Sequence, residues 1–519
     1  MSALLPLLDA HDLIPPLADH EAETVARELA AVCEMTVYPK SVAVKEGRVY
    51  FLARRGTEKL LGVIARRPAA EFRGEERAWE HGVLRLCPAD HANADVLRAA
   101  LPFTAPHCVG DKRTIGMGDR LGLATPGHIR AVRGSGLTPV LAQQSIREMS
   151  RTLRSPSQVM DDVIWAVFEE GYRDGYGADA DHLKSADDIK QTLAAGYRMF
   201  TIDPGDHVDN AAAKDDAATL RDKVRRLPWD ALETTEADYR RMFAGNTFSV
   251  GLHMQLAFSE DDALRAAVKY GRAVAHTVAL YRYLEDRSRG RRFDLEMSVD
   301  ETDSPTTAHE HLYVAHELKR LGVQVASLAP RFVGDFEKGI DYKGDLDAFE
   351  QSFIRHVELA RHFGPYKISI HSGSDKFLIY PVAAKRARDL VHVKTAGTSY
   401  LEALRAIASA TPGLFREILA FAFERYDEDK ATYHVSAKPE VLPRPADLKD
   451  EELASVLDVN DGRQLLHVTY GSVLTAREDG GAFRFRDRLL AALRDNEEAH
   501  YDVICRHFGK HVAPFADPS

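Results

Sequence analysis

From about residue 138 onward, short apolar stretches alternate with amphipathic stretches along the chain. The apolar stretches have the length of buried strands, and the stretches between them have helical spacing and mostly end near a glycine. Eight strands joined by helices are typical of a closed parallel barrel, so the pattern predicts an α/β fold with a (β/α)8 barrel of the TIM type. An open doubly wound sheet is the alternative that the same pattern allows. The strands are expected at residues 138–145, 175–181, 197–204, 293–301, 323–332, 366–375, 390–399 and 465–474.

The remaining segments predict how the barrel is extended. Residues 1–110 are expected to form a small N-terminal α/β domain, with a hairpin over 48–66, and residues 111–519 to form the catalytic barrel domain. The connection 204–292 is too long for one crossover, so we expect an insertion after the third strand, with strand-like residues at 247–258. A second long connection is expected to be helical.

A glycine-rich stretch over residues 110–136 precedes the first expected strand. Its Gly116, Gly118 and Gly122 do not match the spacing of a dinucleotide-binding motif, and no clear strand comes before them. We therefore interpret this stretch as a loop that closes over the barrel mouth or packs against it.

Composition and charge restrict the class of protein. The 519 residues are 45% hydrophobic and 28% charged, which is ordinary for a globular protein. A net charge of −11 argues against a nucleic-acid partner, although one cleft could still be basic and bind an anion. The four cysteines have no C-x-x-C spacing, which favours a cytoplasmic location, and neither a signal peptide nor a membrane span is expected.

Polar side chains gather at the expected carboxyl ends of the strands, where barrel enzymes place their active sites. This concentration predicts an active site at one end of the barrel. The side chains are Asp179, Asp181, His182, Lys184, Asp203, Asp206, His207, Glu296, Asp300, Glu301, Arg331, Asp335, Glu337, Lys338, His371, Ser372, Asp375, Lys376, Lys394 and His467.

The residue types narrow the chemistry to metal binding and proton transfer. His182, His207 and His371, with nearby carboxylates, offer the N/O ligands of a divalent ion such as Zn, Mn or Ni. Glu296 lies within its strand, so we expect burial to raise its pKa, as a general acid requires. The alternative is a buried ion pair between Glu296 and a lysine such as Lys394.

One histidine-rich stretch carries no metal motif. Residues 308–318, AHEHLYVAHEL, have Leu312 where H-E-x-x-H would need its second histidine. We interpret these histidines as solvated residues on a helix face.

Seven blocks of this sequence resemble the tagaturonate/fructuronate epimerase family. The resemblance covers most of the chain from Gly116 to about Leu474, and blocks of this length and composition are specific. The blocks are DADHLK (179–184), TIDPGDHVDN (201–210), EMSVDET (296–302), SLAPRFVGDFEKGIDY (327–342), IHSGSDKF (370–377), KTAGTSYLEALR (394–405) and HVTYGSVL (467–474).

The resemblance implies a metal-dependent interconversion of D-tagaturonate and D-fructuronate in hexuronate catabolism. It also implies a base at Asp181, an acid at Glu296, and metal ligands at His182 and His371, with Glu337 chosen over Asp203 as the third ligand. The carboxylate of such a ketohexuronate substrate would need a cation; the candidates are Arg331, Lys338, Lys376 and Lys394.

The chemistry and the class of protein leave alternatives open. The inverted carbon lies two carbons from the ketone, which favours retro-aldol cleavage and re-addition, with direct deprotonation or a Schiff base through Lys394 as other routes. A metal-dependent aldolase or ketose isomerase could use the same residues. A non-catalytic sugar-acid binding protein is the third possibility.

Overall fold

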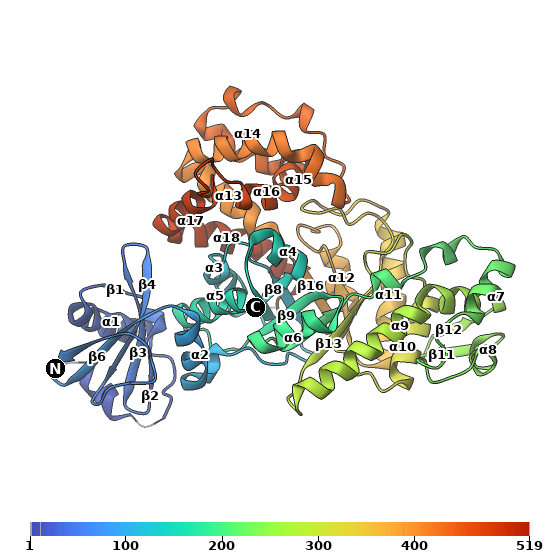
Figure 1. The fold of residues 1–519 in the computed structure, drawn as a ribbon, viewed down its shortest axis with the longest axis horizontal. Helices are drawn as coiled ribbons and strands as arrows, with labels where there is room; N and C mark the ends of the chain where they lie inside the picture. Colours follow the sequence, from blue (N-terminus) through green and yellow to red (C-terminus); the bar gives the residue numbers. More distant parts are fainter. Residues whose placement is uncertain (1–2, 11, 388, 518–519) are drawn as a thin grey trace.

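A closed barrel of eight parallel strands forms the centre of the protein (Figure 1). The computed structural model describes residues 3–10, 12–387 and 389–517. The last strand pairs with the first and closes the barrel, which confirms the predicted barrel over the open sheet. In chain order the strands are β7 (Thr114–Met117), β8 (Thr138–Ser145), β9 (Gly177–Leu183), β10 (Met199–Ile202), β13 (Asp294–Ser298), β14 (Ser327–Ala329), β15 (Lys367–Ile370) and β16 (Val391–Thr395).

Two of the strand predictions are wrong at the ends of the barrel sequence. The first strand, β7, lies inside the glycine-rich stretch that was expected to be a loop. Residues 465–474, expected as the eighth strand, instead form parts of helices α15 (Asn460–Val468) and α16 (Tyr470–Thr475). The four residues of β7 are too few for a periodic signal. The β-branched residues of 465–474 favour a strand locally, but their apolar side chains are buried within a helical cluster.

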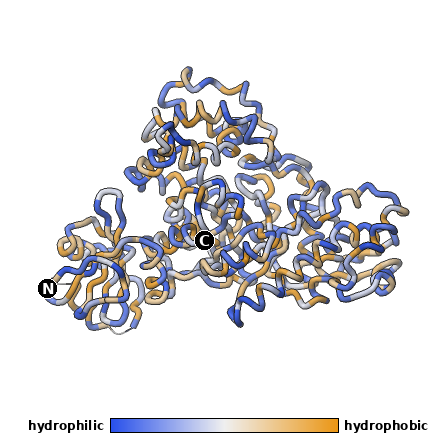
Figure 2. Tube along the Cα trace, in the orientation of Figure 1, coloured by the Kyte–Doolittle hydropathy of each residue, from blue (hydrophilic) through white to orange (hydrophobic). Residues whose placement is uncertain are grey.

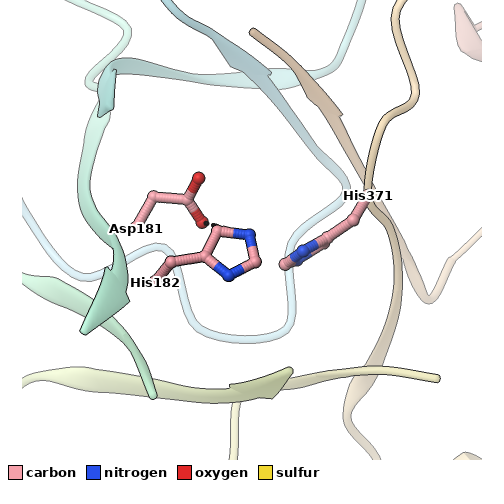
Figure 3. Close-up of side chains that lie close together, drawn as sticks. All are labelled: Asp181, His182 and His371. Atoms are coloured by element: carbon pink, nitrogen blue, oxygen red, sulfur yellow. Dashed lines mark ion pairs between the residues drawn. The ribbon is translucent and has the colours of Figure 1, made fainter. Parts of the chain in front are cut away.

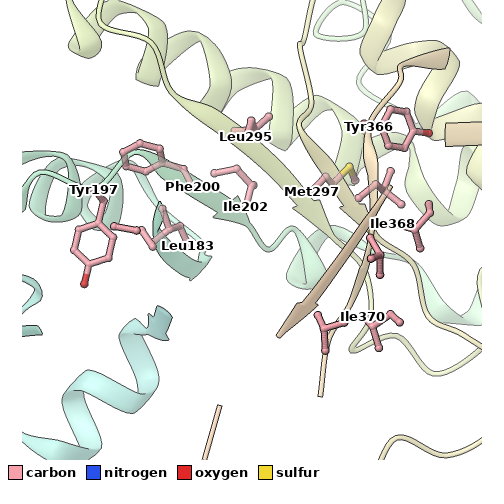
Figure 4. Close-up of a cluster of buried hydrophobic side chains, with 14 of the residues drawn as sticks. Leu183, Tyr197, Phe200, Ile202, Leu295, Met297, Tyr366, Ile368 and Ile370 are labelled. Carbon is pink, nitrogen blue, oxygen red and sulfur yellow. The ribbon is translucent and has the colours of Figure 1, made fainter. Parts of the chain in front are cut away.

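Helices surround the barrel and cover the apolar outer side of its strands. Leu183, Ile202, Met297 and Ile370 belong to this buried layer (Figure 4). The helices are α3 (Thr125–Val132), α4 (Ile146–Thr152), α5 (Pro156–Glu169), α6 (Ala186–Ala195), α9 (Glu260–Ser288), α10 (Ala308–Arg320), α11 (Leu346–Phe363), α12 (Tyr380–Arg386) and α13 (Thr398–Ala410). Side-chain caps fix where several of them begin: Ser155, Ser185, Ser259 and Thr307 each accept a backbone N–H bond as N-caps.

The alternate residues of the same strands are polar and buried. Thr201, Glu296, Ser327 and Lys367 are neighbours across four adjacent strands. Each of them is completely buried. Successive side chains of a strand point to opposite faces, so these residues fill the interior while the apolar residues face the helices. The interior of this barrel is therefore a polar core beneath its mouth.

The N-terminal residues form a separate six-stranded sheet, shown in blue in Figure 1. The predicted hairpin is confirmed, because β3 and β4 pair antiparallel as far as Arg55 and Glu58. The elements are α1 (Asp19–Cys33), β1 (Thr36–Val37), β2 (Ala43–Lys45), β3 (Arg48–Arg55), β4 (Glu58–Ala65), β5 (Glu75–Trp79), β6 (Gly82–Pro88) and α2 (His91–Ala100). The domain boundary at residue 110 stays a prediction.

A long insertion separates β10 from β13. Because β7 begins the barrel, this insertion follows the fourth barrel strand in chain order, which is the strand predicted as the third. Its elements are α7 (Ala217–Arg225), α8 (Glu236–Phe243), the hairpin strands β11 (Thr247–Val250) and β12 (Met254–Ala257), and the long helix α9.

The histidine-rich stretch is helix α10, and one of its histidines corrects the prediction of solvated residues. His311 is completely buried. Its Nδ1 lies 2.8 Å from Nδ1 of His356, and its Nε2 lies 2.7 Å from the hydroxyl of Tyr366. His311 therefore joins helix packing to a polar network, which a helix-face pattern alone does not reveal.

Further helices follow the barrel and form their own apolar cluster above it. They are α14 (Pro412–Asp429), α15, α16 and α17 (Arg486–Asp495), whereas α18 (Glu497–Val512) packs Ile504, Phe508 and Val512 into the apolar cluster of the barrel. Asp375, in the segment after β15, connects them to the barrel. Its carboxylate accepts bonds from Arg463 of α15 at 2.6 Å, from His507 of α18 at 2.6 Å and from Thr398 at 2.8 Å.

Figure 2 shows hydrophobic and hydrophilic residues interspersed along most of the chain. Within the described residues, no helix combines the length and hydrophobicity that crossing a membrane requires.

The Asp375 contacts predict a pH-dependent contribution to stability. Burial alone would raise the pKa of Asp375, but Arg463 and His507 outweigh it and hold this pKa well below its ordinary value. The stabilisation is therefore present above the ordinary aspartate pKa of about 4 and is lost as the pH falls below it. We expect Asp375→Asn to lower the free energy of unfolding by roughly 3 kcal/mol at pH 7, because buried Arg463 keeps only Glu402, at 3.2 Å, as a charge partner.

The measurement is urea unfolding of both proteins at pH 7 and at a pH below the ordinary aspartate pKa of about 4, where the difference between them should shrink. Asp450→Asn is the control, because Asp450 pairs with Arg416 at 2.7 Å on an exposed surface. Equal unfolding midpoints for Asp375→Asn and the wild type at pH 7 would contradict the anchoring role.

Candidate active site

An inner cavity of about 60 Å³ lies at the carboxyl ends of the barrel strands, and an outer cavity of about 490 Å³ adjoins it. The two cavities share Arg147, Asp300, Lys338, His371, Ser372 and Tyr433 in their walls. The inner cavity is also lined by Arg120, Gln143, Ser145, Glu148, Asp181, His182, Gly339, Ser374, Lys394, Ala396 and His467.

Asp181, His182 and His371 form a compact group that could hold a metal ion (Figure 3). Each offers one ligand atom, and these atoms lie within 4.8 Å of one another. Asp181 and His182 are consecutive, and consecutive residues of a regular strand point to opposite faces. His182 has a φ of 51°, and the pairing of β9 with β10 changes register there. This irregularity lets both side chains reach the same cavity.

A second carboxylate orients His182. Nδ1 of His182 lies 3.3 Å from Asp203 Oδ2, while its Nε2 faces Asp181 at 3.8 Å. Burial lowers the pKa of His182, but Asp181 and Asp203 outweigh it and raise this pKa to about 10. Histidine ligands commonly donate their other ring N–H to a carboxylate in this way, which fixes the ring and its tautomer. Asp203, the alternative to Glu337 as third ligand, therefore contacts the candidate ligand His182.

His371 lies between two further carboxylates. Its Nε2 is 2.6 Å from Glu296 Oε1, and its Nδ1 is 3.1 Å from Asp300 Oδ1. Burial lowers the pKa of His371, but Asp300 and Glu296 raise it to about 9. The ring is thus held on both sides, at the end of β15.

Lys394 carries the central positive charge of the site. Its Nζ lies 2.6 Å from Asp179, 2.8 Å from Asp181 and 2.8 Å from Glu296. Burial lowers the pKa of Lys394, but these three carboxylates raise it well above its ordinary value. An ammonium with its protons committed to protein carboxylates is poorly placed for a substrate carboxylate or for a Schiff base. This placement disfavours Lys394 as the group that binds the substrate carboxylate, although Lys394 lines the inner cavity.

Glu296 has the opposite electrostatic character to the one expected. Burial raises its pKa, but Lys394 and His371 outweigh this and hold the pKa of Glu296 well below its ordinary value. The raised pKa is therefore wrong, and the alternative of an ion pair with Lys394 is confirmed. Glu296 is completely buried and is absent from the described walls of both cavities.

The structure also corrects Glu337 as a metal ligand. One oxygen of Glu337 lies 2.9 Å from Nζ of Lys343, and the other accepts bonds from Ser436 and Gln464, both at 2.7 Å. Among the described residues it belongs to neither candidate ligand group. The segment after β14 brings this side chain to Ser436 and Gln464, which lie 99 and 127 residues further along the sequence.

Four other predicted residues have distinct positions. Arg331 lines the outer cavity, and Lys338 lines both cavities with its Nζ 2.6 Å from Ser372 Oγ. Lys376 is corrected as a substrate-binding residue, because it is completely buried and donates to backbone carbonyls, including that of Glu337 at 2.8 Å. His207, the third histidine of the predicted trio, stacks on His276 in the insertion instead.

Sequence reasoning missed several residues of the cavity wall. Arg120 follows β7, the strand hidden in the glycine-rich stretch, and Gln143 lies in β8 with Nε2 3.2 Å from Asp181. Arg147 lies in the first turn of α4, where no strand-end rule points to it. His467 was identified as a candidate, but it reaches the cavity from a helix and not from a strand.

The Asp375, His507 and His511 group is a second arrangement with metal-ligand spacing. Arg463 already pairs with its carboxylate at 2.6 Å, and His511 Nε2 accepts the backbone N–H of Asp375 at 3.0 Å. An arginine beside the carboxylate disfavours a cation there. This group therefore belongs to the contacts through which Asp375 connects the C-terminal helices to the barrel.

A closed parallel barrel with a buried, charged cluster at the carboxyl ends of its strands defines a TIM-barrel enzyme. The sequence model of the tagaturonate epimerases (UxaE) matches residues 38–515. The chain belongs to the tagaturonate epimerase family.

Relatives with known names and structures agree with this assignment. The tagaturonate/fructuronate epimerase of Thermotoga maritima is 43% identical over 479 residues, which are 92% of this chain and 96% of that protein. The native crystal structure of fructuronate-tagaturonate epimerase from Cohnella laeviribosi has a TM-score of 0.88 at 39% identity, covering 96% of this chain and 99% of that chain. A glycerol complex of the same enzyme matches equally well.

The contact between Asp203 and His182 predicts how metal binding will respond to mutation. We expect Asp203→Ala to weaken binding of a divalent ion by roughly 10- to 100-fold, because His182 loses the carboxylate that orients it. His182→Gln should lose binding more completely. The measurement is titration of the metal-free protein with Zn, Mn or Ni.

His507→Gln is the control for this titration, because it removes a histidine from the second group without touching the first. Weakened metal binding in His507→Gln, with unchanged binding in the His182 and Asp203 variants, would show that the wrong group had been chosen.

Proposed function

We propose that this protein interconverts D-tagaturonate and D-fructuronate at the inner cavity of the barrel. Its family, and the printed names of relatives that cover nearly its whole length, support this substrate pair. The observation that carries the proposal is the Asp181, His182 and His371 group beside the buried Lys394, at the mouth of the barrel. Four free cysteines agree with a cytoplasmic location.

We propose that Asp181, His182 and His371 hold a divalent metal ion such as Zn, Mn or Ni. The donor set of two imidazoles and a carboxylate suits such ions, and Asp203 supplies the outer contact that a metal-binding histidine commonly has. When bound, the ion would supply Lewis-acid polarisation of the substrate ketone.

The proton chemistry is proposed for residues that touch the cavity. The inverted carbon lies two carbons from the ketone, so the bond between C3 and C4 breaks as the C4 hydroxyl loses its proton, and the electron pair of that bond moves toward the ketone. Rotation of the resulting aldehyde and re-addition to its other face re-form the bond between C3 and C4 with the carbon inverted, and the C4 oxygen takes a proton back to restore its hydroxyl. Asp181 lines the cavity, and it is ionised because His182 and Lys394 outweigh burial and hold its pKa below the ordinary value. We propose that the oxygen of Asp181 that does not hold the ion accepts this proton.

Glu296 is proposed to act through its neighbours. It contacts His371 at 2.6 Å and Lys394 at 2.8 Å, and Thr201 donates to it at 3.3 Å. Its negative charge keeps Lys394 protonated and fixes the His371 ring. This role replaces the proton donor expected from the sequence. Lys338 and Arg331, in the walls of the larger outer cavity, are proposed to contact the polar part of the substrate.

The exchange of the two sugars tests the function directly. Metal-loaded protein incubated with D-fructuronate should form D-tagaturonate, followed by NMR, and chelated protein should not. Absence of exchange under both conditions would refute the proposed activity. Accumulation of a three-carbon aldehyde without inversion would favour an aldolase instead.

Glu296→Gln tests the proposed role of this carboxylate. We expect kcat to fall by roughly 100-fold or more, because Lys394 and His371 lose a charged partner beside the reacting groups. The matched control is Glu310→Gln, which removes a carboxylate 3.0 Å from the buried Lys269 outside the cavities. Both variants should cost similar stability, but only the first should change kcat. A kcat close to that of the wild type for Glu296→Gln would sink the assignment.

A further inference from the structure

The wall between the two cavities carries two cations, Arg147 and Lys338. Of the other cations lining the inner cavity, Arg120 is committed to Glu148 through two bonds of 2.8 and 2.7 Å. Lys394 is committed to the interior carboxylates. Among the arginine and lysine side chains that line the inner cavity in the described part of the chain, Arg147 and Lys338 are therefore the ones that could bind a new anion.

A carboxylate of the protein itself already lies beside both cations. Glu301, in the segment after β13, has its Oε1 3.2 Å from Arg147 Nη2 and 3.9 Å from Lys338 Nζ. The side chains of Arg147 and Glu301 are about half exposed, at 46% and 41%. An exposed pair of this kind contributes little stability, so a second carboxylate can displace Glu301 at low cost.

The position of the two cations relative to the metal group is also defined. Lys338 Nζ lies 2.6 Å from Ser372 Oγ, and Ser372 directly follows His371. Arg147 lies in the first turn of α4, which begins at the end of β8 where Ser145 caps it. An anion held by this pair would lie next to the candidate metal ligand His371.

We propose that Arg147 and Lys338 together bind the carboxylate of the ketohexuronate, in the place that Glu301 occupies in the structure. This inference rests on the proposed function. The guanidinium of Arg147 can form two parallel bonds to a carboxylate, and Lys338 adds a second positive charge. The pair makes the protein select a sugar acid over the neutral ketohexose of the same configuration.

The first test is the variant Arg147→Gln. We expect its KM for D-fructuronate to rise roughly 10- to 100-fold, the effect of losing a hydrogen-bonded charge, with a much smaller change in kcat. The inhibition constant of the neutral ketohexose D-fructose should stay unchanged. Arg147→Lys should lie between the two proteins, because an ammonium keeps the charge and loses the bidentate geometry.

The second test predicts a change in KM in the opposite direction. Glu301→Gln removes the competing carboxylate, so the KM for D-fructuronate should fall by a few fold. A Glu301 that bound a substrate hydroxyl would instead give a raised KM. The matched controls are Arg221→Gln and Glu260→Gln, from an exposed pair at 3.2 Å with similar exposure outside the cavities, and both should leave KM unchanged.

The outcomes separate this inference from the proposed function. If the wild type does not exchange the two ketohexuronates, the proposed function fails. If it does, an unchanged KM in Arg147→Gln overturns the carboxylate site, as does an equal loss of binding for D-fructuronate and D-fructose. A shift in selectivity confined to Arg331→Gln would move the site to the outer cavity and also overturn it.

Discussion

The ammonium of Lys394 is the group on which the rest of the site depends. Asp179, Asp181 and Glu296 project from two strands into the same small volume, and three carboxylates so close together could not all ionise without a cation among them. Lys394, from the last strand of the barrel, supplies that cation. Because it joins β16 to β9 and β13 across the interior, it connects the charge balance of the site to the closure of the barrel.

The site is organised in layers above this lysine. Glu296 lies below His371 and fixes its ring, and Asp203 does the same for His182 from the neighbouring strand. The two rings and Asp181 then face an inner cavity too small for a whole sugar acid. The larger outer cavity adjoins it and offers space for the rest of the proposed substrate, and the C-terminal helices hold the segment after β15 in place through Asp375.

The sequence predicted the barrel, and it predicted that Asp181, His182 and His371 lie at one end of it, because both depend on local patterns. Asp181, His182 and His371 follow recognisable strands, so their convergence follows from barrel geometry. The predictions that are wrong share one physical cause: in each case, contacts between residues far apart in the sequence determine the structure. Ser436 and Gln464 take the carboxylate of Glu337, and backbone carbonyls surround Lys376. In the same way β7 is stabilised by its two neighbouring strands rather than by its own four residues.

The pKa of Glu296 also depends on long-range contacts that the sequence does not reveal. Position within a strand correctly predicts burial, but the direction of the pKa shift depends on which charges share the buried volume.

The most direct test of the proposed site is a crystal structure of the protein loaded with Zn, Mn or Ni, with anomalous diffraction used to locate the ion. The account predicts a peak roughly 2.0–2.3 Å from ligand atoms of Asp181, His182 and His371. A peak elsewhere, such as between Asp375, His507 and His511, or the absence of one at the inner cavity, would contradict it.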